Sequence, residues 1–290
     1  MLDLSKIKRP SNLPQWAKPP LDEVAISVQF NDIAGLKTIH YGLLAERLKP
    51  LGLTQSEDKA PINAAFEVFG KRVAPVQFQF QAVDAPLARV WYLSDDRHRL
   101  VQVQPDRFVY NWRKVAGAGD YPRFDTVLAE FLERCQIFEA FISDQGLPSL
   151  ALNQCELSYF NVIEVAEGET YHDAFARIFR FWSSQPNAAA LNGGSNLEKD
   201  SGNINLSHIL RGPDASPLAR IHTNIVAAER RNQRVVRLAL IFRGPWTQTV
   251  DMPLLEFFAL GREAIARLFD SMITDQMHAI WGRTVSDSGS

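Results

Sequence analysis

The strongest constraint on the fold is residues 100–113, in which apolar and polar residues alternate on both sides of a Pro-Asp turn. Such alternation predicts two antiparallel strands in a sheet that has one buried face. One side of this hairpin then carries Val101, Val103, Phe108, Tyr110 and Trp112. The other side carries Gln102, Gln104, Arg107, Asn111 and Arg113. Amide and guanidinium groups make hydrogen bonds but supply no nucleophile, so the polar side indicates a binding surface.

The other periodic segments follow an order that occurs twice along the chain. In the first half we expect strands at 23–31, 76–81, 89–93 and the hairpin, and helices at 36–48 and from Asp125, as the cap, to about 146. In the second half we expect strands at 152–163, 203–210, 219–228 and 235–242, and helices at 171–182 and 253–280. This order predicts an α+β fold of two tandem β-α-β(3–4)-α repeats, residues 21–147 and 148–283.

In each repeat, a curved antiparallel sheet is expected to be backed by its long helix. Strand, helix, four strands and helix is the element order of one half of a TATA-binding-protein-like saddle, which is the fold we predict. A helix-grip sheet around a single long helix is the alternative. Two linkers, 52–61 and 186–202, occupy the same position in the two repeats.

The two ends of the chain differ in composition from the repeats. Residues 1–20 are basic and rich in proline, which predicts an extended arm that lies on the body or is free in solvent. Residues 284–290 are small and polar, and we expect a disordered tail.

Composition limits the classes of partner and of compartment. The net charge of −2 gives no overall attraction to nucleic acid or to anionic membranes, so nucleic-acid binding would depend on local basic patches such as Arg230, Arg231 and Arg234. Cys135 and Cys155 have apolar neighbours and no C-x-x-C spacing, which predicts buried free thiols in a reducing compartment. No segment has the apolar length of a membrane span or a signal peptide, so we expect a cytoplasmic protein that does not bind membranes.

The sequence contains no catalytic, phosphate-binding or metal-binding motif, so we expect no cofactor and no metal ion. A hydrolase or nuclease with a non-standard site, assembled from Glu156, Arg107 and His222, is left open.

The predicted function is therefore non-enzymatic binding or scaffolding by the Gln/Asn/Arg-rich face of the sheet. We expect the ligand, a protein partner or a second copy of the chain, to contact eight residues from adjoining strands. They are Gln79, Gln102, Gln104, Arg107, Asn111, Arg113, Gln154 and Glu156. Nucleic acid bound through its backbone is the alternative ligand.

Two segments, 101–113 and 153–161, resemble the signature of a sporadically distributed family of uncharacterised bacterial proteins of similar length. Residues 19–30 and 277–282 are similar to that family too, so the resemblance covers nearly the whole chain. It implies no activity, substrate or cofactor. The family's scattered distribution implies an association with defence systems or mobile elements.

Overall fold

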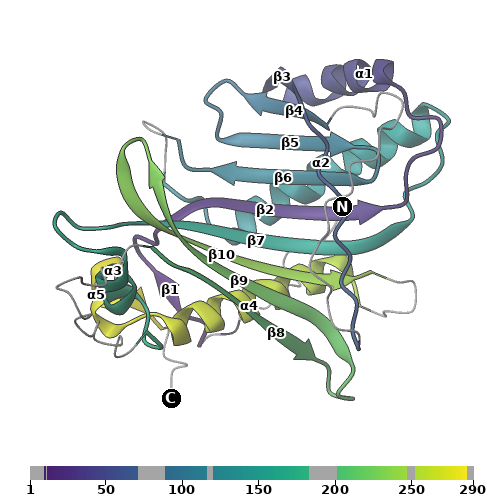
Figure 1. Cartoon of the computed structure of the whole chain (residues 1–290). Coiled ribbons are helices and arrows are strands. Elements are labelled where there is room, and N and C mark those ends of the chain that lie inside the picture. The colour runs from purple at the N-terminus through teal and green to yellow at the C-terminus, as the bar shows by residue number, and fades with distance from the viewer. Residues whose placement is uncertain are drawn as a thin grey trace, which may run out of the picture.

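The fold is seen in a computed structural model, which describes residues 10, 12–70, 89–115, 120–182, 201–246 and 252–285. In this part of the chain the protein is an α+β structure with one nine-stranded antiparallel sheet and five α-helices (Figure 1). The strands of the sheet are β2 (Leu21–Phe30), β3 (Leu53–Lys59), β4 (Arg89–Ser94), β5 (Arg99–Gln104), β6 (Arg107–Arg113), β7 (Leu152–Glu164), β8 (Asn203–Arg211), β9 (Pro217–Arg230) and β10 (Gln233–Pro245). The helices are α1 (Thr38–Leu48), α2 (Phe124–Asp144), α3 (Tyr171–Ile178), α4 (Leu254–Met272) and α5 (Asp275–Trp281).

The strands lie in the order β3-β4-β5-β6-β2-β7-β10-β9-β8. The first strand of each half of the chain, β2 or β7, therefore lies at the centre, and β2 pairs with β7 along most of its length. On each side of this central pair the other strands follow in reverse chain order. The expected two sheets are thus joined into one.

The two long helices, α2 and α4, cover the same face of the sheet (Figure 1). Alternation in the hairpin explains the contact, because Phe108 points to this face and packs against Phe131 and Phe138 of α2. In the second half, the ring of Phe242 lies against Gly261 of α4. The core lies between this face and the helices.

Four predicted elements differ in the structure. The linker expected at 52–61 contains the edge strand β3, which pairs with β4. Its sequence is almost entirely polar and therefore lacks the apolar alternation from which a strand is predicted. The helix expected at 253–280 is two helices, because the backbone is extended at Ile273 and Thr274 then caps α5. Helix α2 begins after Arg123, so Asp125 lies in its first turn and is not its cap. The helix expected to reach residue 182 ends at Ile178. The strand expected at 76–81 lies outside the described residues.

The two ends of the described chain lie next to each other. Strand β1 (Gln15–Trp16) pairs with β11 (Arg283–Thr284). Trp16 is buried, packs edge-on against Phe269 and donates a hydrogen bond from its indole nitrogen to His278. The described part of the basic arm therefore lies on the body of the protein.

Candidate binding site

The face of the sheet opposite α2 and α4 is polar. Cross-strand pairing aligns Arg107 with Gln29, and Gln29 with Gln154, so side chains from β6, β2 and β7 form one polar row. We call this side of the sheet the polar face. Although it points away from the core, Gln102, Gln104, Asn111 and Gln154 are buried. Gln102 and Asn111 hydrogen-bond to each other and to Arg89, Trp91 and Glu23 on neighbouring strands, whereas Gln104 and Gln154 are covered by another part of the chain.

The cover is an irregular segment of the chain itself, residues 60–70, which we call the strap. It follows β3 and crosses the polar face in front of the sheet (Figure 1). Its contacts connect the first half of the chain to β7, β9 and β10 of the second half.

Gln104 and Gln154 hold the backbone of the strap. The side chain of Gln104 accepts a hydrogen bond from the N–H of Ile62 at 3.0 Å and donates to the C=O of the same residue at 2.9 Å. Gln154 accepts from the N–H of Glu67 at 2.8 Å and donates to the C=O of Ala65. A carboxamide has both a donor and an acceptor, so these two side chains bind peptide groups regardless of the residue type that carries them.

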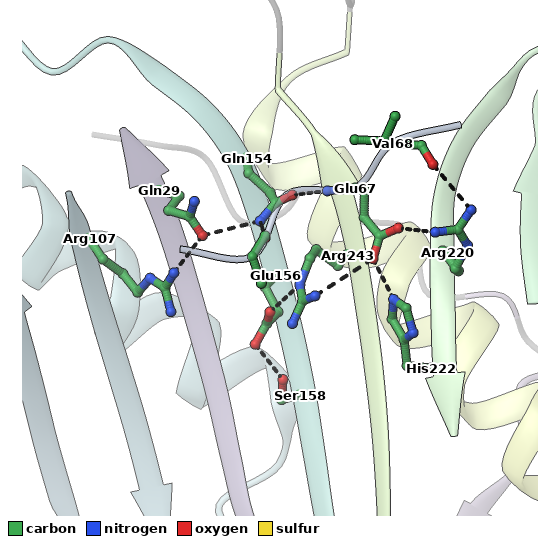
Figure 2. Close-up of polar contacts among 11 residues, drawn as sticks. Gln29, Glu67, Val68, Arg107, Gln154, Glu156, Ser158, Arg220, His222 and Arg243 are labelled. Atoms are coloured by element: carbon green, nitrogen blue, oxygen red, sulfur yellow. Dashed lines mark hydrogen bonds and ion pairs between the residues drawn. The ribbon is translucent and has the colours of Figure 1, made fainter. Parts of the chain in front are cut away.

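The carboxylate of Glu67 is the one deeply buried charge of the strap, with a side chain 3% exposed. Arg220 of β9 donates to it at 2.5 Å, His222 of β9 donates to its other oxygen, and Arg243 of β10 lies 3.7 Å away (Figure 2). We call Gln154, Arg220, His222 and Arg243 the cradle.

Electrostatics explains why Glu67 is ionised in the cradle. Burial opposes ionisation, but the hydrogen bond from His222 and the charges of His222, Arg220 and Arg243 outweigh it and hold the pKa of Glu67 below its ordinary value. Within the cradle, Arg243 also forms an ion pair with Glu156 at 2.6 Å. The carboxylate of Glu156 in turn accepts a hydrogen bond from Ser158.

Beside the strap the polar face is hollowed into a groove of about 780 Å³, lined from β2, β5, β6, β7, β9 and β10. Of the sequence-predicted site residues, Gln102, Arg107, Asn111 and Glu156 line this groove. Within the described residues, Arg107 makes no ion pair and donates only to Gln29, at 2.7 Å. Burial lowers the pKa of Arg107, with the carboxylates of Asp106 and Glu156 acting in the opposite direction.

Arg237 and Glu23 line the same groove further along the strands. In the part of the chain that the structure describes, neither makes a salt bridge. Glu23 accepts a hydrogen bond from Asn111 at 2.6 Å. Burial raises the pKa of Glu23, and the hydrogen bond from Asn111 and the charges of Arg113 and Arg237 offset this only in part.

The remaining predicted residues have other positions. Gln104 and Gln154 lie under the strap, as described above. Arg113 donates to the carbonyl of Arg97, in the turn after β4, and lies over the ring of Trp91 on β4, so its contacts connect β6 to β4 within the sheet. Gln79 lies outside the described residues.

Sequence reasoning missed the cradle as a site. Alternation along β9 and β10 does place Arg220, His222 and Arg243 on the polar face, and that signal was available. Glu67 had no such signal, because the strap has neither helical nor strand periodicity.

Other kinds of site receive no support in the described residues. No group of His, Cys, Asp or Glu side chains there is arranged to hold a metal ion. Cys135 and Cys155 are free and buried, and burial raises the pKa of both thiols. None of the helices described is both long and apolar enough to cross a membrane.

The chain was compared with protein families and with curated proteins. No family model and no curated protein matches it. The resemblance to the sporadically distributed bacterial family therefore stays an expectation.

Proposed function

We propose that this protein is a non-enzymatic binding protein that holds an extended segment of a protein partner on its polar face. The observation that carries the proposal is that the chain's own strap lies there as an irregular segment, with its backbone hydrogen-bonded to Gln104 and Gln154. The groove beside the strap is also lined by amides, those of Gln102 and Asn111, which hydrogen-bond to each other and to neighbouring side chains of the sheet. A polypeptide has the alternating donors and acceptors that such amides bind.

Charge in the groove favours a polypeptide over nucleic acid. Arg107, Arg230 and Arg237 line it, but so do four carboxyl groups. The carboxyl groups are those of Asp22, Glu23, Glu156 and Glu229. A phosphate backbone needs an excess of cations, whereas a protein segment with charges of both signs can pair with this mixture.

The contacts of Glu156, Arg107 and His222 argue against a catalytic role for these residues. Each is engaged by a different neighbour, namely Arg243, Gln29 and Glu67, and Arg107 and His222 lie at opposite ends of the cluster in Figure 2. A general base must reach the group that it activates. No such contact joins these three.

We further propose that the chain arose by internal duplication and has the saddle fold. The strand order is mirrored about β2 and β7, and two long helices cover one face of the sheet, which supports this proposal. The alternative, a helix-grip fold, has a single long helix. Membership of the sporadically distributed family, and a role in defence or mobile elements, are proposals on the resemblance alone.

The proposed function can be tested by capturing partners with the tagged full chain from lysate of the cells that produce it. Arg107→Ala/Arg237→Ala removes the two groove cations that make no ion pair within the described residues, and we expect about a tenfold loss of the captured protein. Arg47→Ala is the matched control, because Arg47 pairs with Asp144 on the exposed surface of the helices. Equal capture by the double variant, or capture of nucleic acid in place of protein, would contradict the proposal.

A further inference from the structure

The strap is held on the sheet almost entirely by polar contacts. Three of its large apolar side chains are exposed, namely Ile62 at 38%, Phe66 at 57% and Val68 at 47%, and a fourth, Phe69, is half-buried. Apolar burial is the main source of stability for a folded segment. A segment with little of it opens at a lower free energy than the sheet below it, so the strap can leave while the sheet stays folded.

Two side chains of the cradle are also held by groups outside the strap. Arg243 is held by Glu156, and Gln154 donates to Gln29 on the neighbouring strand as well as to the strap. Arg220 and His222 belong to β9, which pairs with strands on both sides. The sheet thus fixes the backbone positions of Arg220 and His222, and it also holds the side chains of Arg243 and Gln154.

Without Glu67 the cradle carries positive charge and contains no carboxylate of its own to balance it. Arg220 is 8% exposed, and within the described residues Glu67 is its single ion-pair partner. When the strap leaves, Arg220, His222 and Arg243 lose the carboxylate that they share, and charge-assisted hydrogen bonds favour entry of another carboxylate.

Resting on the function proposed above, we propose that the cradle is the site that recognises a glutamate in an extended segment of the partner protein, and that the strap is the internal competitor of that segment. The contacts of the strap indicate which residues the partner segment needs. Gln154 binds the N–H of the glutamate and the C=O two residues before it. Phe69, two residues after Glu67, lies against the guanidinium of Arg220 at 5.2 Å. The partner segment therefore carries Glu-x-aromatic, with an aromatic ring on Arg220.

The test uses a fluorescently labelled peptide with the sequence of residues 60–70, added to the full-length chain. The wild-type chain should bind it weakly, because the tethered strap competes at an effective concentration on the order of millimolar. Glu67→Ala empties the cradle, and the peptide should then bind about tenfold more tightly than to the wild type.

Two matched controls identify the contact. Glu67→Ala/Arg220→Ala should bind the peptide about tenfold more weakly than Glu67→Ala alone, and so should a peptide with glutamine in place of its glutamate. If Glu67→Ala fails to give a cooperative thermal transition, Glu67→Gln takes its place, since an amide keeps the size of the side chain. Equal binding to the wild type and to the emptied chain, or equal binding of the two peptides, would overturn the inference.

The outcomes separate this inference from the proposed function. If the peptide does not distinguish these variants while Arg107→Ala/Arg237→Ala still loses the captured partner, the cradle is not the recognition site and the proposed function stands. If the wild type is a dimer by light scattering that Glu67→Ala dissociates, the occupant is the strap of a second copy, and the partner segment is excluded.

Discussion

At the scale of single residues, Glu23 is a carboxyl group that folding keeps from ionising easily. Its pKa is raised above the ordinary value of 4.5, first by burial, so the folded chain becomes less stable as the pH rises through that raised pKa. Below the ordinary value both the folded and the unfolded chain are protonated, and the penalty disappears. Glu23→Gln removes the charge and leaves an oxygen to accept from Asn111. We expect it to raise the melting temperature at neutral pH.

The measurement is thermal unfolding near pH 7 and near pH 4, with Glu164→Gln, an exposed carboxyl on β7, as control. The gain from Glu23→Gln should be present at the higher pH and small at the lower one, and the control should show neither. A loss of stability at neutral pH would mean that ionised Glu23 stabilises the fold.

Where apolar and polar residues alternate clearly, the sequence predicts which face of the sheet a side chain occupies. Alternation alone places Arg107 and Asn111 on the polar face together with Glu156, and the three line one groove. It does not reveal that Glu67, in an aperiodic segment, lies on the same face. That contact joins residues more than 150 positions apart and depends on the path of the whole chain.

At the scale of elements, glycine sets how closely α4 approaches the sheet. A Cβ at Gly261 would lie 2.6 Å from the ring of Phe242 on β10, closer than two carbon atoms can approach. Gly261→Ala should therefore destabilise the protein by about 1–3 kcal/mol, although alanine favours a helix over glycine by about 1 kcal/mol. Gly42→Ala in α1 is the matched control, because nothing lies within 4 Å of its new methyl group, and it should stabilise. Denaturant unfolding of both variants measures the difference, and a stabilised Gly261→Ala would show that the helix can move away freely.

Elements were predictable to the extent that their own sequences carried the signal. Strands β2, β5, β6 and β7 alternate clearly and were expected where they occur. Strand β3 was missed because its sequence, Leu-Thr-Gln-Ser-Glu-Asp-Lys, does not alternate. Most side chains of this edge strand are exposed, so polar residues are tolerated at successive positions. The break between α4 and α5 was missed because Ile273 fits the apolar pattern of a continuous helix. Thr274 caps α5 by accepting a hydrogen bond from the N–H of Met277, and its hydroxyl donates to the carbonyl of Arg177 in α3.

At the scale of the whole molecule, many contacts between described residues join the first half of the chain to the second. Among them, strand β2 pairs with β7 (Figure 1), the strap places Glu67 against Arg220 (Figure 2), and Trp16 donates a hydrogen bond to His278. The element order predicted the two halves. It did not reveal these joints, which depend on pairing between segments distant in sequence.

Because these contacts join the two halves of the chain, we predict one cooperative unfolding transition for the full chain. Separating the halves would leave β2 and β7 as open edges and would expose Trp16, so neither half gains from folding first. Calorimetry should give a single peak whose calorimetric and van't Hoff enthalpies agree, and circular dichroism and tryptophan fluorescence should report the same midpoint. Residues 21–147 expressed alone should lack a cooperative transition. Two resolved peaks, or a stably folded 21–147 fragment, would instead show that each half is an independent domain and that the central β2–β7 pair contributes little to stability.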